Sequence, residues 1–316
     1  MMNVNKILVI RYSGLGDIVM LLQTLKKLKE KYNNSTITLL TDHSNSAILK
    51  NTCGVIDEII PINRKVFKEK KIIALLKELQ SLFFNVRKKQ YDLLIDFQNF
   101  GETATISYLA KATEKIGAPK KEKYYYGYTK IVQRDESGHR SQFFSRIAEV
   151  SDNLDFSKLC LESNGEKYKN SLLKRLDKNK KIIGLNIGST QDSRRWSEQN
   201  FYKLAKELEE KYNILVFIGP AEKKFESTFK DLYVVKDTSL NQLCGAISIC
   251  DYFVTNDTGP AHIAAGFGVP TLTFFEIAID ENTGALIDKK LFIKNTKINE
   301  ISVKEAKDKL LQLTNI

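Results

Sequence analysis

The sequence predicts an α/β protein with two doubly wound domains, each built around a parallel sheet. Short β-branched runs alternate with longer helical patterns through most of the chain, as in β-α-β units. The length of 316 residues suits two domains of about 150 residues each. A polar, irregular stretch at residues 151–165 separates two such series. We therefore place the domains at residues 1–157 and 158–316.

Each series supplies its own set of expected strands. In the first series these are residues 6–11, 36–40, 57–62 and 91–97. In the second they are residues 181–188, 214–219, 233–237, 252–256 and 271–275, and apolar spacing at residues 301–314 predicts a closing helix. Both domains are Rossmann-like, and ligands of such sheets bind beyond the carboxyl ends of the strands. We expect the site in a cleft between the domains.

Composition narrows the class of protein. No apolar run approaches the roughly 20 residues of a membrane span, and the start lacks the pattern of a secretory signal, so we expect a cytoplasmic protein. The four cysteines have no paired short spacing, which argues against a zinc site. A net charge of +11 attracts nucleic acid, anionic membranes or phosphorylated small molecules. Without a nucleic-acid-binding motif, we expect no nucleic acid partner.

The stretch "RYSGLGD" places two glycines and a carboxylate where the first strand meets a helix. Gly14 and Gly16 permit positive φ and close approach of a ligand to the backbone, so both are candidate ligand-binding residues. Asp17 stands where a helix N-cap belongs, and it also projects from the strand ends. Asp17 could cap the helix and also take part in a reaction. The stretch lacks the third glycine of a dinucleotide fingerprint, which opposes an oxidoreductase.

The stretch "VTNDTGPAHIAAG" predicts a phosphate site. A strand runs into Asp257, Thr258 and Gly259, and Pro260 suits the first turn of a short helix. Backbone amides and the helix dipole at such a start bind phosphate. A simpler alternative is a helix capped by Asp257 or Thr258, with His262 packed in the core.

The stretch "GLNIGSTQDSRRW" places Arg194 and Arg195 in a loop after a strand. Arginines at strand ends suit bidentate contact with a diphosphate. The alternative is an arginine pair that faces solvent. Trp196 beside them is expected to anchor the loop by packing.

In this order and spacing, the motifs resemble glycosyltransferase family 9, the bacterial heptosyltransferases of lipopolysaccharide core assembly. The matching segments are "SGLGD", "YDLLIDFQ", "EKIGA", "SRRW", "FIGPAE" and "NDTGPAHIAAGFGVP". The resemblance implies a GT-B fold, with the acceptor on the first domain and the sugar nucleotide on the second. It also implies transfer with inversion at the anomeric carbon.

The resemblance implies a role for three residues in the reaction. Asp17 corresponds to the base that deprotonates the acceptor hydroxyl. Arg194 takes the place of a lysine that contacts the diphosphate, and Asp257 corresponds to the carboxylate at the donor sugar. Backbone amides, a helix start and an arginine can stabilise the leaving diphosphate. Because no Asp-x-Asp site accompanies the motifs, we expect no metal and no other cofactor.

On the nucleotide side, Glu222 corresponds to the acid that holds the ribose hydroxyls. Thr258, Gly259 and His262 correspond to residues at the phosphates. The family favours ADP as the nucleotide. The resemblance implies heptose as the donor sugar, but the chain departs from the family pattern at residues 275–285, so we expect heptose or a related sugar. A protein or another glycan remains an alternative acceptor, and a non-catalytic nucleotide-binding protein remains an alternative function.

Basic residues gather after the third expected strand, at Arg64, Lys65 and Lys68. They are candidates for holding an anionic saccharide or lipid-linked acceptor. A second use is peripheral contact with the anionic inner face of the plasma membrane, where each basic residue contributes about 1 kcal/mol.

Overall fold

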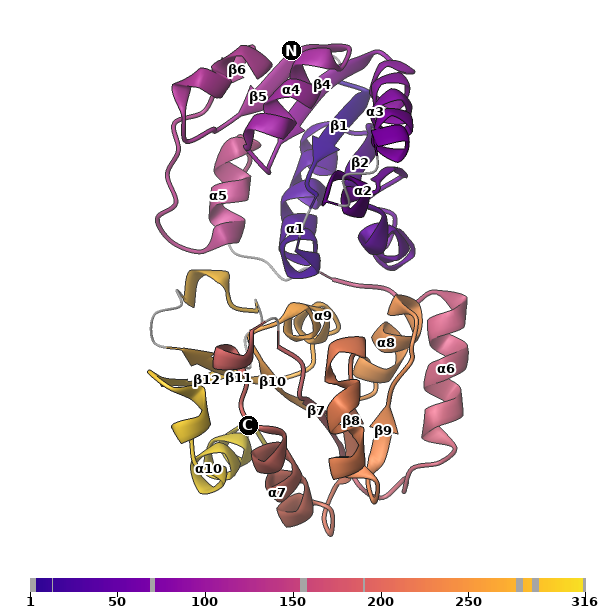
Figure 1. Cartoon of the computed structure of the whole chain (residues 1–316), viewed down its shortest axis with the longest axis vertical. Coiled ribbons are helices and arrows are strands. Elements are labelled where there is room, and N and C mark those ends of the chain that lie inside the picture. Colours follow the sequence, from indigo (N-terminus) through magenta and orange to yellow (C-terminus); the bar gives the residue numbers. More distant parts are fainter. Residues whose placement is uncertain are drawn as a thin grey trace. The chain divides into compact units, whose positions relative to one another are not determined.

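Two six-stranded parallel sheets organise the structure (Figure 1). This computed structural model describes residues 4–12, 14–68, 72–153, 158–189, 191–276, 281–285 and 290–314. The chain divides into two units, Met1–Asp155 and Phe156–Ile316, and each contains one sheet. The predicted fold class, α/β with two Rossmann-like doubly wound domains, is confirmed.

The sheet of the first unit has the strand order β3-β2-β1-β4-β5-β6. Its strands are β1 (Lys6–Ile10), β2 (Thr36–Asp42), β3 (Glu58–Ile62), β4 (Tyr91–Asp96), β5 (Ala112–Gly117) and β6 (Lys130–Ile131). Central β1 pairs with β2 on one side and with β4 on the other, in register Ile7↔Leu93. This is the order of a dinucleotide-binding sheet, whose ligands bind where the order reverses.

The second unit repeats this arrangement, with the order β12-β11-β10-β7-β8-β9. Its strands are β7 (Ile182–Asn186), β8 (Asn213–Phe217), β9 (Tyr233–Val235), β10 (Tyr252–Asn256), β11 (Thr271–Glu276) and β12 (Lys290–Asn295). Counted within the unit, β7 and β10 are again the first and fourth strands, and they pair in parallel. The order therefore reverses between β7 and β10, as it does between β1 and β4.

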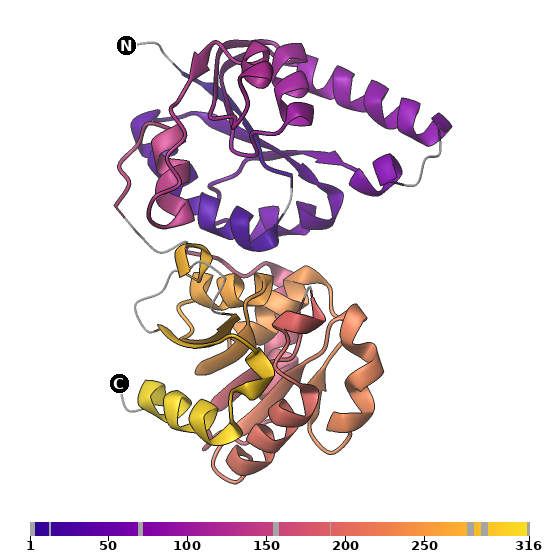
Figure 2. The same cartoon turned by 60° about the vertical axis from the view of Figure 1, so that its left-hand side comes forward.

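Helices connect the strands on both faces of each sheet. Those of the first unit are α1 (Leu15–Lys31), α2 (Arg64–Lys68), α3 (Ile72–Arg87), α4 (Gly101–Leu109) and α5 (Arg140–Ile147). Those of the second are α6 (Ser163–Leu173), α7 (Glu198–Leu208), α8 (Leu240–Ile247), α9 (Gly259–Gly266) and α10 (Val303–Thr314). Helices α7 and α10 pack side by side (Figure 2). Among the described residues, no helix is long and apolar enough to cross a membrane.

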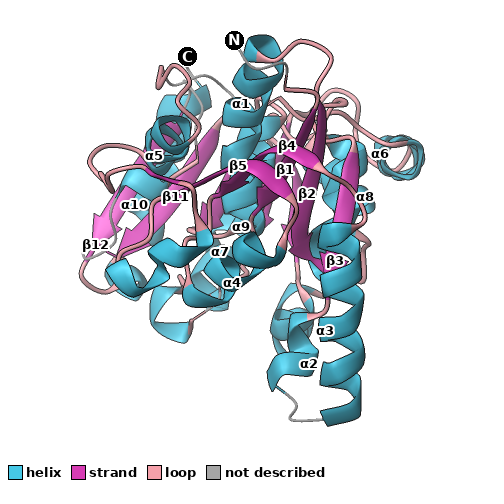
Figure 3. Ribbon diagram, turned by 90° about the horizontal axis from the view of Figure 1, so that it is seen from above, coloured by secondary structure: helices cyan, strands magenta, loops and turns pink. Residues whose placement is uncertain are grey.

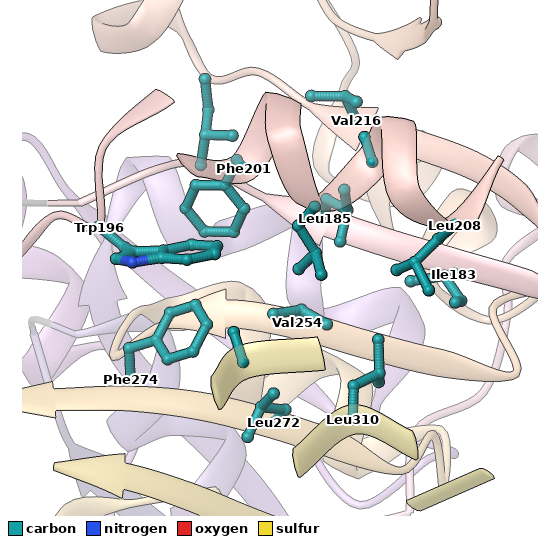
Figure 4. Packing of buried hydrophobic residues seen from close by; sticks show 14 of the residues in the cluster. Ile183, Leu185, Trp196, Phe201, Leu208, Val216, Val254, Leu272, Phe274 and Leu310 are labelled. Atoms are coloured by element: carbon teal, nitrogen blue, oxygen red, sulfur yellow. The ribbon is translucent and has the colours of Figure 1, made fainter. Parts of the chain in front are cut away.

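An aromatic cluster forms part of the core of the second unit (Figure 4). The Trp196 ring is fully buried, with its centroid 4.6 Å from that of Phe274 and 4.8 Å from that of Phe201. Its indole Nε1 donates to the carbonyl of Ile301 at 2.8 Å. The prediction that this tryptophan anchors its loop by packing is confirmed.

Several elements differ from the sequence prediction. β5 was not predicted because "ATEKIG" carries Glu114 and Lys115 in mid-strand, and β6 and β12 were not predicted either. α6 begins at Ser163, inside the expected linker, where the carboxylate of Glu162 accepts from the amide of Asn164 at 3.0 Å. Residues 154–157 lie outside the described residues, so the boundary after residue 157 stays a prediction.

Candidate active site

Most of the candidate site residues follow the strands at which the sheet order reverses. Gly14 lies in the loop after β1, Asp17 lies in the first turn of α1, and the segment after β7 carries Arg194. Asp257 follows β10 directly, and Glu222 lies after β8. Loops that leave adjacent parallel strands in opposite directions form the crevice in which such sheets bind ligands.

The turn from β1 into α1 depends on a glycine. Gly14 has φ +82° and is the N-cap of α1, without a side-chain hydrogen bond to the helix. A Cβ at this position would lie 2.4 Å from Oδ2 of Asp17. The expectation that Asp17 is the N-cap is wrong, because α1 begins at Leu15 and Asp17 lies within its first turn, one residue after buried Gly16.

Two arginines hold Asp17 instead. Its Oδ2 accepts a short hydrogen bond from Nη2 of Arg11, and its Oδ1 accepts from Nη1 of Arg140 at 3.0 Å. The side chains of Arg11 and Asp17 are 9% and 15% exposed, whereas that of Arg140 is 42% exposed. Neither arginine was a sequence candidate. Arg11 directly follows β1, and this position could have been used to predict it as a site residue. Arg140 is 123 residues from Asp17, so the sequence did not indicate that the two residues meet.

Arg11 also joins the ends of β1 and β4. Its Nη1 donates to the carbonyl of Phe97 at 2.9 Å, and its guanidinium lies 5.3 Å from the ring centroid of Phe144. Burial lowers the pKa of Arg11, and the nearby Asp17 carboxylate opposes that shift. The buried guanidinium is thus balanced by the carboxylate that it positions.

Asp96, within the "YDLLIDFQ" motif, organises the loop after β4. Its carboxylate is fully buried and accepts from the amides of Gln98 and Asn99, at 2.8 and 3.0 Å, and from the hydroxyl of Tyr128 at 2.6 Å. Burial raises the pKa of Asp96, and these hydrogen bonds oppose the shift. The side chain of Gln98 in turn accepts from the amide of Tyr12 at 3.2 Å, which ties this loop to the loop after β1.

A pocket of about 270 Å³, here called the polar pocket, opens beside Gly14. It is lined by Tyr12, Gly14, Asp42, Ser44, Asn45, Arg64 and Lys65. The structure therefore brings Arg64 and Lys65, two predicted acceptor contacts, to the same pocket as the glycine that packs on Asp17. Lys68 is the last residue of α2, and its side chain lies outside the described residues.

In the second unit, Asn256 at the end of β10 holds the loop after β7. Its Oδ1 accepts from the amide of Trp196 at 2.9 Å. Its Nδ2 donates to the carbonyls of Ile187 and Gly188, at 3.3 and 3.0 Å. The asparagine is fully buried, and it was not a sequence candidate although it begins the "NDTG" motif.

The structure gives the two neighbouring arginines different environments. Arg195 is buried, and its Nη2 donates to Oε1 of Glu222 at 2.9 Å and to the carbonyl of Ser189 at 3.2 Å. Glu222 is also buried, and a Cβ at Gly219 would lie 2.8 Å from its Oε2. The arginine pair thus does not face solvent as a unit, because Arg195 is committed to Glu222.

Arg194, by contrast, is partly exposed. Its side chain is 38% exposed, and its Nε lies 3.7 Å from the carboxylate of Glu276. Glu276 ends β11 and belongs to the segment in which the chain departs from the family pattern. Residues 277–280 of that segment lie outside the described residues.

Helix α9 begins without a side-chain cap. Thr258 is the N-cap, but its side chain does not bond the helix amides. Its hydroxyl accepts from Nδ2 of Asn186 at 3.1 Å. The side chain of Thr258 therefore does not cap the helix. Helical geometry begins at Gly259, which is followed by Pro260. His262 is 6% exposed, as a packed histidine would be.

The described residues contain no cluster of three or more His, Cys, Asp or Glu side chains suited to a metal ion.

Comparison with known proteins identifies the family. The model of glycosyltransferase family 9 (heptosyltransferase) matches residues 79–313. The chain belongs to this family. It is a glycosyltransferase, and the predicted family is confirmed.

Related proteins and structures agree with this family. Lipooligosaccharide heptosyltransferase 2 of Campylobacter jejuni is 27% identical over 272 residues, which cover 83% of this chain and 77% of the relative. The fold matches that of a family 9 glycosyltransferase from Veillonella parvula, with TM-score 0.87, 18% identity and coverage of 99% and 98% of the two chains. It also matches E. coli ADP-heptose lps heptosyltransferase II, with TM-score 0.82, 20% identity and 98% coverage of each chain.

The two arginines allow a matched test of their environments. Arg195→Ala leaves the Glu222 carboxylate buried without its cation and should lower the free energy of unfolding by about 3–5 kcal/mol. Arg194→Ala, at a partly exposed position, should change it by about 0.5 kcal/mol or less. Denaturant unfolding followed by fluorescence of Trp196, the only tryptophan, reports on this unit directly. Equal stability of the two variants would contradict the assignment.

Proposed function

We propose that this enzyme transfers heptose, or a related sugar, from a nucleotide diphosphate donor to a saccharide acceptor, with inversion at the anomeric carbon. ADP-heptose is the first donor to test, and a lipopolysaccharide core or another surface saccharide is the proposed acceptor. The names of the relatives support this choice. The observation that carries the proposal is Asp17, a carboxylate held at the end of β1 beside a pocket lined by Arg64 and Lys65.

In the proposed reaction, Asp17 takes the proton of the acceptor hydroxyl while the oxygen of that hydroxyl attacks the anomeric carbon. The bond from that carbon to the diphosphate oxygen breaks, and its electron pair leaves with the nucleotide. In the structure, Arg11 and Arg140 each donate to one of the two oxygens of this carboxylate. The acceptor therefore has to displace one arginine, and the exposed Arg140 is the one that can leave.

On the donor side, we propose that Arg194 and the start of α9 stabilise the charge that grows on the departing diphosphate. Preorganised donors aimed at such charge are a large source of rate enhancement. Thr258 and Gly259 supply backbone amides at the helix start, and His262 lies in the next turn. Asp257 is the proposed contact of the donor sugar.

Glu222 is the proposed contact of the nucleotide ribose, since carboxylates accept hydrogen bonds from paired hydroxyls. Its position beside Gly219 supports this role, because a side chain there would occupy the approach to Oε2. Gly14 and Gly16 are proposed to let a ligand approach the backbone after β1.

The basic residues of the polar pocket support an anionic acceptor. Arg64 and Lys65 can hold carboxylates or phosphates on a saccharide or a lipid-linked acceptor. Lys68 is proposed to extend this cluster. The proposed location is the cytoplasm, with peripheral contact at the inner face of the plasma membrane, and the net charge of +11 supports attraction to anionic lipid.

Asp17→Asn should lower turnover by about a hundredfold or more and leave donor affinity unchanged, because an amide cannot take the proton during attack. Asparagine keeps the size of the side chain and one acceptor for the arginines. Nucleotide release with a lipopolysaccharide core acceptor measures turnover, and calorimetry with ADP measures binding. Wild-type turnover in this variant would exclude Asp17 as the base.

Arg194→Ala should lower turnover on the order of a hundredfold to a thousandfold, by removing one charge contact to the leaving diphosphate. Arg194→Lys keeps the charge and should recover part of the rate. Asp257→Ala, tested in the same nucleotide-release assay, should also depress turnover. Wild-type kinetics in both alanine variants would contradict the donor site.

The proposed reaction requires no metal, since amides, a helix start and an arginine supply the charge stabilisation. Turnover should therefore be the same with EDTA as with added Mg²⁺ or Mn²⁺. Loss of turnover in EDTA that either ion restores would show that a metal takes part.

A further inference from the structure

The first unit contains a second pocket, of about 400 Å³, that adjoins the polar pocket. We call it the apolar pocket, and its lining is Tyr12, Ile62, Arg64, Phe67, Leu79, Leu82, Phe83, Val86, Glu102, Thr105, Ile106 and Leu109. The two pockets share Tyr12 and Arg64. The pockets are therefore neighbours, and a ligand that reaches both would meet different chemistry at its two ends.

The walls of the apolar pocket are mostly helical. Helix α3, which projects beside α2, supplies one side, and α4 supplies another (Figure 3). Phe67, Leu79 and Phe83 line the pocket yet remain 41%, 43% and 37% exposed. Protein interiors rarely leave voids of this size, whereas pockets of about 300–1,000 Å³ are typical of small-molecule sites. The hollow therefore fits an apolar ligand better than a packing defect.

A cation lies where the two pockets meet. The Arg64 guanidinium lies 5.5 Å from the ring centroid of Tyr12, and one of its nitrogens is 3.8 Å from the Glu102 carboxylate. Its side chain is 35% exposed, so an anionic group can reach it. The arrangement matches an amphiphile in which the hydrocarbon chain is attached directly to the charged group.

We propose that the apolar pocket binds a hydrocarbon chain of the acceptor while the acceptor's anionic, sugar-bearing end lies in the polar pocket. The enzyme would then take a lipid-linked acceptor. This assignment rests on the proposed function, because it assumes that the polar pocket holds the acceptor. Binding of the chain itself is independent of turnover and is tested separately.

Alkyl phosphates of increasing length are suitable probes, used as monomers. Hexyl, octyl and decyl phosphate should bind with affinities that rise about three- to fourfold for each added methylene until the pocket is full. Calorimetry should also show a negative heat-capacity change that grows with chain length. Inorganic phosphate tests the charged end alone. Equal affinity for all chain lengths would overturn the proposal.

Helix α3 offers a matched pair of variants. Phe83 lines the apolar pocket, whereas the adjacent Phe84 does not and is 60% exposed. Phe83→Gln should weaken decyl phosphate binding at least tenfold and leave inorganic phosphate binding unchanged, while Phe84→Gln should bind as the wild type does. An equal loss in both would indicate adsorption to the helix surface, and no loss in either would exclude the pocket. Both outcomes overturn the proposal.

Thr105 provides a variant that fills the pocket instead of emptying it. It is an exposed residue of α4, so Thr105→Phe should fold and should block chain binding sterically. Undiminished binding of decyl phosphate would count against the pocket. ADP affinity, measured on each variant, checks that the second unit is intact.

Kinetics distinguish an acceptor chain from a membrane lipid. Phe83→Gln should raise KM for an acylated acceptor at least tenfold and leave KM for its deacylated form unchanged. If both values stay at wild type although alkyl phosphate binding is lost, the chain belongs to another lipid and the acceptor assignment is wrong. If the wild-type enzyme releases no nucleotide from ADP-heptose with a saccharide acceptor while the chain-length dependence persists, the proposed function fails and the hydrocarbon site stands.

Discussion

The parallel pairing of the first and fourth strands within each sheet determines where the candidate residues after β1, β7 and β10 lie. β1 pairs with β4, and β7 pairs with β10. Because the connections from these strands leave toward opposite edges of the sheet, their carboxyl ends are not covered by a common crossover. The polar loops that follow these strands can therefore meet a ligand, while the buried runs before them form the cores.

The two units keep these loops in place by related means. The fourth strand of each ends in a buried polar residue, Asp96 in β4 and Asn256 in β10. Asp96 orders its own loop, and Gln98 then bonds the loop after β1. Asn256 bonds the loop after β7 directly, through Trp196 and Gly188. Apolar residues at these positions would leave the loop amides and carbonyls without partners.

Much of the fold was predictable because its signals are local. The strands before the site are continuous apolar runs, and the family motifs occupy the segments after them, so Asp17, Glu222 and Asp257 each fall between a strand and the next strand of the sequence. β5 lacked such a run because charged residues interrupt it. Sequence also misplaced the cap of α1, since Gly14 takes that position without a side chain and leaves Asp17 to bond elsewhere.

Other features of the site arise only from tertiary structure. Nothing in the order of residues distinguishes Arg194 from Arg195, and only burial beside Glu222 shows which of them is committed. Arg140 meets Asp17 because α5 packs against α1. The apolar pocket beside Arg64 forms only where α2, α3 and α4 come together. Such contacts require the folded chain.

Because the two arginines at Asp17 differ in exposure, ionic strength should weaken one of their two contacts with that carboxylate more than the other. Mobile ions screen exposed charge pairs far more than buried ones. The Arg11 contact, which is nearly dry, should persist in concentrated salt, whereas the wetter Arg140 contact should weaken. The carboxylate thus has one permanent counter-charge and one that the surrounding electrolyte can loosen, so its environment responds to the medium without any rearrangement of the fold.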